Sequence, residues 1–395
     1  MRILVFCDED LSIAAGGARQ VLEFAQALSR RSHTLRIVAP QPAQGRQLAP
    51  EFAKLSFRPV SVWRVAGLRP FSFLVASWNA LRQELAAWRP DVLLWFDSPG
   101  QIAPLAALFG HACATVLFVN GLPEEEVQGV WRLPFVRWVL RTALKTAACR
   151  AQGVVSICRE IVTQMQDASS IPPERCHVIR NGVDEDRFHP QPHEAARTVL
   201  GLPVKGLWIG FVGGFFPWHG LETLIEAVPF VHAKVPSATF LLVGEGPTKL
   251  ALEQLVQQQG LTEIVRFVGR ADWAQVPTWI AACDVCVVLH RQTRSYPGDS
   301  MKLWEYLSCG RPVVTTKGPG YGETVEAIGC GLAAEPNHAQ DVAQQLIRLL
   351  DDPDERRKMG DRGRMAIIQA HTWDARAREL EVACSAAVAA MRRTT

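Results

Sequence analysis

The stretch YPGDSMKLWEYLSCGRPVVTT, residues 296–316, predicts a loop, a short helix with one inward-facing carboxylate, and a buried strand. Ser300 offers N-cap chemistry, good helix formers follow it, and Gly310 can take the left-handed C-cap conformation. The first amides and the positive dipole end of such a helix form a site for an anion such as a diphosphate. Glu305 lies about one turn further on, within reach of neighbouring hydroxyls. On the alternative reading, Lys302 and Glu305 only pair at i, i+3 on a solvated face.

Length and composition indicate a two-domain globular protein. The 395 residues are too many for one ordinary core, and 48% are hydrophobic while 21% are charged. No run approaches the 18 apolar residues that a membrane span needs, and the net charge of +3 is too small to indicate a nucleic-acid partner. The chain opens directly with a strand and shows no signal-peptide pattern, so we expect a cytoplasmic protein.

The cysteines do not predict a metal site. There are ten of them, and Cys283 and Cys286 form the only CxxC pair, inside an apolar strand-like run. Small buried thiols are the expected state of such a pair, and no second ligand cluster accompanies it.

A basic and aromatic segment occupies residues 130–150, VWRLPFVRWVLRTALKTAACR. It carries five cationic residues and no acidic one, with Trp131, Phe135 and Trp138 among them. This composition is typical of a helix on a membrane surface, whereas an ordinary surface helix would turn its Trp and Leu residues to the core. A second region of the same kind favours the membrane surface; it contains Arg58, Trp63, Arg64, Arg69, Phe71, Phe73 and Trp78. We therefore expect peripheral membrane contact through residues 130–150.

Apolar runs alternate with helical patterns along the whole chain. Strands are expected at 3–6, 35–39, 92–96, 114–119, 153–156 and 178–179, and again at 208–212, 239–243, 265–268 and 285–289. Continuous apolar strands with crossover helices predict parallel sheets covered on both faces. A proline-containing linker near residue 190 separates the two halves. We expect α/β domains at residues 1–190 and 200–373, with a helix at 374–395 packing back on the first.

Ligands of open α/β sheets bind beyond the carboxyl ends of the strands, so two such domains facing each other would enclose a cleft. Gly16 and Gly17 follow the first strand just before a helix, where they permit close approach to a ligand or simply make a flexible loop. Residues 243–247, VGEGP, also end a strand, but Lys249 takes the place of the third glycine of a nicotinamide-type fingerprint.

The ordered motifs resemble the retaining, two-Rossmann-domain glycosyltransferases of family 4, the glycosyltransferase group 1 type with the GT-B fold. The resemblance covers nearly the full chain and is carried by segments that include GGARQVLEFAQALSRRSHTLRIV at 16–38, VIRNGVDEDRF at 178–188, GFVGGFFPWHGLETLIEAV at 210–228 and GYGETVEAIGCG at 320–331. It implies transfer of a sugar from a nucleoside diphosphate sugar, with the acceptor on the first domain and the donor on the second. It implies no cofactor and no metal.

The resemblance also implies roles for individual residues. Glu305 matches the carboxylate that accepts hydrogen bonds from the donor ribose. The backbone of Ser300, Met301, Lys302 and Leu303, with Gly16 and Gly17 opposite, would enclose the diphosphate. Glu245 and Arg270 either border the nucleotide or are exposed loop charges.

The chain departs from the family pattern where the sugar is handled. The family's first glutamate, eight residues before Glu305, is Pro297 here, and Asp299 either replaces it or serves as a structural cap. Gly214 and His219 stand where an arginine and a lysine are common. A neighbouring diphosphate would favour protonated His219, which could then act as a cation or proton donor.

Other residues are available to replace the lost charge, namely Lys302, Arg291 and Arg294. Asn120 stands where the family often has a histidine at the end of the strand at 114–119. An amide can orient a hydroxyl but cannot act as a base. We take His219, Lys302 and Asn120 as the candidate catalytic residues.

The mechanism implied is retaining transfer, in which the departing diphosphate draws the proton from an acceptor hydroxyl on the same face. The acceptor is expected to be a glycan, a lipid-linked precursor or another component of the cell envelope. Two alternatives stay open: a weakly active nucleotide-sugar-binding partner subunit, and a sugar-nucleotide epimerase or hydrolase. The sequence assigns neither the donor base and sugar nor the acceptor, the linkage or the oligomeric state.

Overall fold

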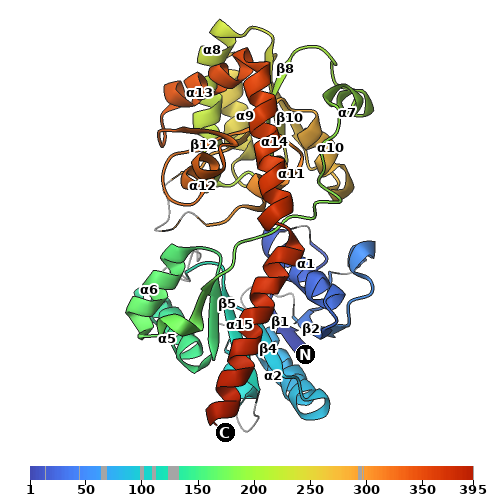
Figure 1. Ribbon diagram of the computed structural model, residues 1–395, viewed down its shortest axis with the longest axis vertical. Coiled ribbons are helices and arrows are strands. Elements are labelled where there is room, and N and C mark those ends of the chain that lie inside the picture. The colour runs from blue at the N-terminus through green and yellow to red at the C-terminus, as the bar shows by residue number, and fades with distance from the viewer. Residues whose placement is uncertain are drawn as a thin grey trace. The chain divides into compact units, whose positions relative to one another are not determined.

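A computed structural model describes residues 1–13, 15–43, 45–63, 69–97, 102–108, 113–122, 133–291, 296 and 298–394. The chain divides into two compact units (Figure 1). The first unit consists of Met1–Asn181 together with the chain from Trp373 onward, and the second unit is Gly182–Thr372.

The first unit is built on a parallel sheet with the strand order β3-β2-β1-β4-β5-β6-β7. Its strands are β1 (Arg2–Phe6), β2 (Thr34–Pro40), β3 (Phe57–Val60), β4 (Val92–Phe96), β5 (Ala114–Val119), β6 (Gly153–Ser156) and β7 (Cys176–Val178). Its helices are α1 (Gly16–Arg30), α2 (Arg69–Trp88), α3 (Ala103–Ala107), α5 (Pro134–Arg150), α6 (Arg159–Ser169) and α15 (Trp373–Thr394). The strands β4 and β5 are buried along their whole length, as the sequence predicts for a sheet covered on both faces.

Crossover handedness assigns these helices to faces of the sheet. The connections from β3 to β4, β4 to β5, β5 to β6 and β6 to β7 all run in one direction along the sheet, so right-handed crossovers place α2, α3, α5 and α6 on one face. The helix α1 joins β1 to β2 in the opposite direction and lies on the other face. There it contacts α15, which crosses β4, β5 and β6 (Figure 1).

The second unit repeats this plan with the parallel order β10-β9-β8-β11-β12-β13. Its strands are β8 (Leu207–Val212), β9 (Ala238–Val243), β10 (Val265–Gly269), β11 (Val285–Val288), β12 (Val313–Thr316) and β13 (Gly331–Ala334). Its helices are α7 (His193–Val199), α8 (Leu221–Lys234), α9 (Lys249–Gln258), α10 (Val276–Ala281), α11 (Met301–Ser308), α12 (Tyr321–Ile328), α13 (Ala339–Asp351) and α14 (Pro353–Ala370). Its core contains two large clusters of buried apolar side chains and a small one of alanines.

The segment before β8 belongs to the second unit rather than to a linker. Phe188 is buried in that unit's core, and its carbonyl accepts hydrogen bonds from Ser308 Oγ at 2.5 Å and Arg364 Nη1 at 2.9 Å. The boundary therefore falls at residue 182, ahead of the predicted positions 190 and 200.

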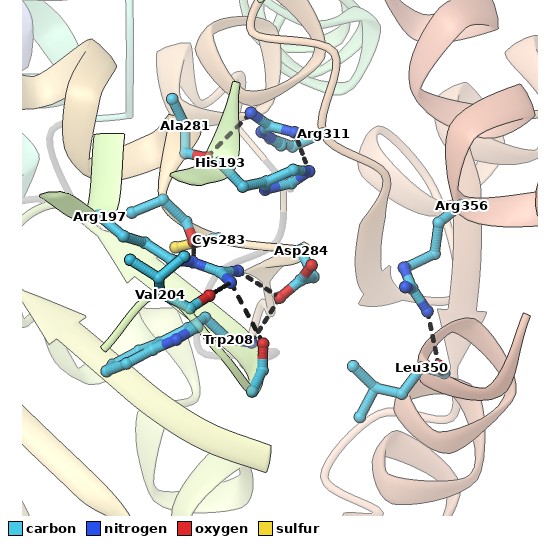
Figure 2. Close-up of polar contacts among 12 residues, drawn as sticks. His193, Arg197, Val204, Trp208, Ala281, Cys283, Asp284, Arg311, Leu350 and Arg356 are labelled. Carbon is cyan, nitrogen blue, oxygen red and sulfur yellow. Dashed lines mark hydrogen bonds and ion pairs between the residues drawn. The ribbon is translucent and has the colours of Figure 1, made fainter. Parts of the chain in front are cut away.

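A buried polar network then fixes α7 (Figure 2). Arg197 Nη2 donates to Asp284 Oδ2 at 2.7 Å, and the same carboxylate oxygen accepts from Trp208 N at 2.6 Å. Arg311 donates to the carbonyl of Ala281 at 2.9 Å and contacts His193 Nε2 at 2.7 Å. His193 and Arg197 lie between the two predicted domains, where the sequence suggested a linker. Their contacts instead join α7 to residues at the amino-terminal ends of the strands.

The predicted strands and the helix from 301 agree with the structure to within a few residues. The seventh strand is Cys176–Val178, where 178–179 was expected. The sequence did not predict the short strands β3 and β13 or the helices α3, α6, α7, α10, α12, α13 and α14. In the described part of the chain, none of the helices is both long enough and apolar enough to cross a membrane.

Candidate active site

The helix α11 is fastened to the end of β8 by Tyr306. The Tyr306 hydroxyl accepts from the Val212 amide at 2.8 Å and donates to the Val212 carbonyl at 3.0 Å. Burial raises the pKa of this phenol well above its usual range, so the hydroxyl keeps the proton that it donates. The start of α11 is therefore held beside the loop that follows β8.

Lys302 and His219 meet at that loop. Lys302 Nζ lies 3.2 Å from His219 Nε2, while His219 Nδ1 lies 2.6 Å from the carbonyl oxygen of Gly214. A carbonyl can only accept, so Nδ1 carries the hydrogen and Nε2 of the neutral ring accepts from the lysine. His219 is thus an acceptor in this arrangement, where the sequence suggested a cation or a proton donor.

Lys302 is packed tightly along its length. A Cβ placed on Gly213 would come within 2.5 Å of Lys302 Cδ, and Nζ lies 5.6 Å from the centre of the Phe211 ring. Burial lowers the pKa of Lys302 to about 8, and the charge of Glu305 opposes that shift. Lys302 is therefore a cation near neutral pH that titrates just above it.

The first turn of α11 differs in detail from the predicted anion cradle. Ser300 occupies the N-cap position with extended backbone, but its hydroxyl makes no capping hydrogen bond. The Leu303 amide donates to the Ser300 carbonyl at 3.2 Å and the Leu303 side chain is in the core. The predicted role of Leu303 therefore needs correction, and Met301 and Lys302 provide the amides at this helix end that have no intrahelical partner.

Glu305 is a buried carboxylate one turn into α11, with 7% of the residue exposed. Asp299 is equally buried and accepts from the indole nitrogen of Trp304 at 3.2 Å. Of the two roles considered for Asp299, this contact favours the structural one, because the carboxylate anchors the loop to α11. Pro297 and Arg294 lie outside the described residues.

The loops after β8 and β9 touch backbone to backbone. A Cβ on Gly244 would lie 1.9 Å from the Gly213 carbonyl oxygen, and one on Gly246 would lie 2.3 Å from that of Phe215. Glu245, between these glycines, pairs with Lys249 at 2.6 Å, and Arg270 is exposed. Within the described residues Glu245 and Arg270 do not form an ion pair with each other, and their predicted place at the nucleotide stays a prediction.

In the first unit, Gly16 and Gly17 begin α1, as expected. A Cβ on Gly17 would lie 2.7 Å from Glu9 Oε1, at the far end of the Glu9 side chain. Burial raises the pKa of Glu9, while Arg69 opposes the shift. A carboxylate therefore already contacts the turn that we predicted to face a diphosphate.

Asn120 is held by a chain of side-chain amides. Asn120 Nδ2 donates to Gln20 Oε1 at 2.6 Å, and Gln20 Nε2 donates to Asn181 Oδ1 at 2.7 Å. This chain directs Nδ2 of Asn120 to Gln20 and leaves Oδ1 as an acceptor, buried and without a partner among the described residues. Sequence reasoning missed Gln20, although it lies one helical turn after Gly16–Gly17 and faces the sheet.

The basic segment forms α5, which begins at Pro134. Its leucines Leu140 and Leu144 are buried, whereas Phe135 is 72% and Trp138 is 62% exposed. In an ordinary surface helix the Trp side chain would face the core, whereas Trp138 faces outward. Trp131, Arg132 and Arg64 lie outside the described residues.

No group of three or more His, Cys, Asp or Glu side chains suited to a metal ion occurs among the residues that the structure describes. Cys283 and Cys286 are buried thiols, and burial raises the pKa of Cys286 well above its ordinary value.

Comparisons with known proteins agree with this architecture. The family described as Glycosyl transferases group 1 matches residues 193–366, and Glycosyltransferase Family 4 matches residues 14–187. The GDP-mannose-dependent alpha-(1-6)-phosphatidylinositol monomannoside mannosyltransferase of Mycobacterium tuberculosis is 30% identical over 293 residues, covering 73% of this chain and 74% of that relative.

Solved structures share the fold. A sucrose-phosphate synthase from Thermosynechococcus elongatus superposes with a TM-score of 0.80 at 20% identity, covering 96% of this chain and 97% of the other. Anabaena HepE in complex with UDP-glucose superposes with a TM-score of 0.76 at 19% identity, covering 98% of this chain and 99% of the other. With two parallel α/β units of the GT-B type and both family patterns in order, the chain belongs to the group 1 glycosyltransferases of family 4.

Proposed function

We propose that the protein transfers a sugar with retention from a nucleoside diphosphate sugar to an acceptor hydroxyl, at a donor site built on α11. The contact between Lys302 and His219 carries this proposal, because it places a cation beside the first amides of α11 and one turn from Glu305. A helix N-terminus and a cation together suit a diphosphate, and the carboxylate suits ribose hydroxyls.

In the proposed reaction, the bond between the sugar anomeric carbon and the diphosphate oxygen breaks while the acceptor oxygen bonds to that carbon on the same face. The acceptor proton passes to the departing diphosphate. The amides of Met301 and Lys302, with the Lys302 ammonium, stabilise the charge that develops there. Each preorganised donor of this kind commonly contributes about 2.7–4 kcal/mol. No metal ion or cofactor is part of the proposal.

Asn120 and Gln20 are proposed to serve the acceptor side. The hydrogen bond to Gln20 leaves Oδ1 of Asn120, just after β5, without a partner among the described residues, and such an atom can accept a hydrogen bond from a hydroxyl. An amide can orient the nucleophile without taking its proton, which fits a reaction in which the leaving diphosphate is the base.

We also propose that the acceptor is lipid-linked and that the enzyme works in peripheral contact with the cytoplasmic face of a membrane. The Mycobacterium tuberculosis relative is named for a phosphatidylinositol mannoside acceptor. Exposed apolar side chains lie at or near the amino-terminal ends of three helices on one face of the sheet, α2, α3 and α5; they are Phe71, Ile102, Leu133, Phe135 and Trp138. Exposed aromatic and aliphatic side chains on one face are what a membrane surface binds.

The substitution Glu305→Gln tests the donor site while keeping the shape of the buried side chain. We expect kcat/KM for the nucleotide sugar to fall about 10- to 100-fold, since hydrogen bonds to a charged group contribute about 1.5–3 kcal/mol. The exposed Glu326→Gln in the same unit is the control. A panel of nucleoside diphosphate sugars, screened by thermal shift, identifies the donor first.

Product analysis separates the alternatives. Donor binding without turnover in any acceptor mixture would favour a partner subunit. Gly214 supports this alternative, because it supplies no cation where the family commonly has an arginine. Consumption of donor without an acceptor would favour an epimerase or hydrolase. If the Glu305→Gln variant transfers sugar at the unchanged rate, the proposed donor site on α11 is wrong.

A further inference from the structure

A stripe of positive charge runs along the exposed side of α5. Arg137, Arg141 and Lys145 follow one another at intervals of four residues, so their side chains lie on one face of the helix. All three are exposed, and the chain from 133 to 150 holds no acidic residue. Within the described part of the chain, Arg137 and Lys145 take part in no ion pair.

This stripe lines a pocket of about 610 Å³ that also includes Ala168, in the last turn of α6. The pocket is lined by Pro134, Arg137, Trp138, Arg141, Thr142, Lys145 and Ala168. The helices α5 and α6 lie side by side on the same face of the sheet (Figure 1). Asp167 neighbours Ala168 on α6, but it does not line the pocket.

The side-chain groups around this pocket favour an anion. The two guanidinium groups and the ammonium group can only donate hydrogen bonds. The Thr142 hydroxyl already donates its hydrogen to the Trp138 carbonyl at 2.8 Å, so the donors available in the pocket are the three cationic groups. Clustered donors of this kind match the oxygens of a phosphate group, and arginines bind phosphate in bidentate fashion.

The surroundings of the pocket identify the source of the phosphate. Phe135 stacks on Trp138 with ring centres 6.1 Å apart, and both rings are mostly exposed at the amino-terminal end of the stripe. Leu133 and Val139 extend this apolar edge. Exposed aromatic rings next to cations are typical of a protein surface that lies at the boundary between lipid headgroups and acyl chains.

We propose that the pocket between α5 and α6 binds the headgroup phosphate of an anionic phospholipid while Phe135 and Trp138 enter the bilayer interface. The inference rests on the membrane contact proposed above and adds a defined headgroup site to it. A site of this kind fixes the orientation of the first unit on the membrane, which diffuse attraction of basic residues to an anionic surface does not.

The test compares two double substitutions in the full-length protein. Arg137→Ala/Lys145→Ala removes two cations from the pocket, and Arg150→Ala/Arg159→Ala removes two exposed cations from the same helices outside it. Binding is measured by co-sedimentation with phosphatidylcholine vesicles that contain or lack phosphatidylglycerol. We expect the pocket variant to lose about tenfold or more in affinity for the anionic vesicles and the control to lose about threefold or less. Neither variant should change thermal stability, because all four side chains are exposed.

Calorimetric titration with soluble dihexanoylphosphatidylglycerol and with inorganic phosphate tests the pocket itself. Saturable binding of the lipid that is lost in the pocket variant and kept in the control supports the proposal. Equal losses in the two variants would show diffuse attraction, which overturns the headgroup site and leaves the membrane contact standing. Binding of inorganic phosphate or of single-stranded nucleic acid in preference to the lipid would also overturn it. Absence of vesicle binding by the unmodified protein would refute the membrane contact, while donor turnover tests the transferase activity separately.

Discussion

Lys302 supplies the positive charge of the proposed donor site, and that charge depends on pH. Burial lowers the pKa of Lys302 to about 8, so the ammonium is present below that pH and is lost as pH rises through it. Since kcat/KM reports the ionisation of the free enzyme, we expect kcat/KM for the nucleotide sugar to fall above about pH 8, approaching tenfold per pH unit. Steady-state rates between pH 6.5 and 9.5 measure this.

The variant Lys302→Arg is the matched comparison, because a guanidinium stays charged over this whole range. We expect its kcat/KM to be lower at pH 7, owing to the tight fit of Lys302 against Gly213, but flat between pH 7 and 9. A fall of equal steepness in this variant would assign the titration to another group.

Among the secondary-structure elements, α11 depends on its hydrogen bonds to β8. Replacing Tyr306 by Phe keeps the ring volume but leaves the Val212 amide and carbonyl without the hydroxyl that now pairs both. Leaving a buried polar group unpaired costs about 1–3 kcal/mol, which lowers the melting temperature of a domain of this size by about 2–4 °C per kcal/mol. Differential scanning calorimetry measures the shift.

The same substitution should also raise KM for the nucleotide sugar, since it frees α11 from the loop that carries His219. A melting temperature within 1 °C of the parent protein would show that the Tyr306 hydroxyl does not hold α11 in place.

The helix α11 could be predicted from sequence because its signals are local. Gly298 and Gly310 have φ of 71° and 69° on either side of a run of helix formers, and glycine is the residue that takes such values readily. The alternating strands were predictable for a similar reason, since a fully buried parallel strand is a continuous apolar run.

The contacts that assemble the candidate site could not be predicted in this way. His219 and Lys302 are 83 residues apart in the chain, and Gln20 and Asn181 are 161 apart. Which polar side chains meet depends on strand order and on how neighbouring loops pack, and neither is encoded in local periodicity. The contact between Glu9 and Gly17 could not be predicted either, because it depends on the conformation of the turn after β1.

At the scale of the whole molecule, the position of the boundary between the units follows from polar contacts. The chain from Gly182 to α7 would be a flexible connection on composition alone, yet Phe188, Arg197 and Arg311 bind it to the second unit. The second unit therefore includes its own entry segment, and the stability of that unit depends on the groups that hold the segment.

His193 makes that stability depend on acidity. Burial, aided by the charge of Arg311, lowers its pKa from 6.5 to about 4, so the folded protein keeps a neutral imidazole that the unfolded chain protonates first. The free energy of unfolding should thus fall as pH decreases from about 6.5 to about 4, by roughly 1–3 kcal/mol because the side chain is only partly buried. Urea unfolding of the full chain at pH 7.5, 5.5 and 4.5 measures this, with exposed His189→Gln as the control for His193→Gln. The His193 variant should be less stable at pH 7.5 and lose less stability on acidification. Parallel losses in the parent protein and both variants would attribute the acid sensitivity to carboxyl groups instead.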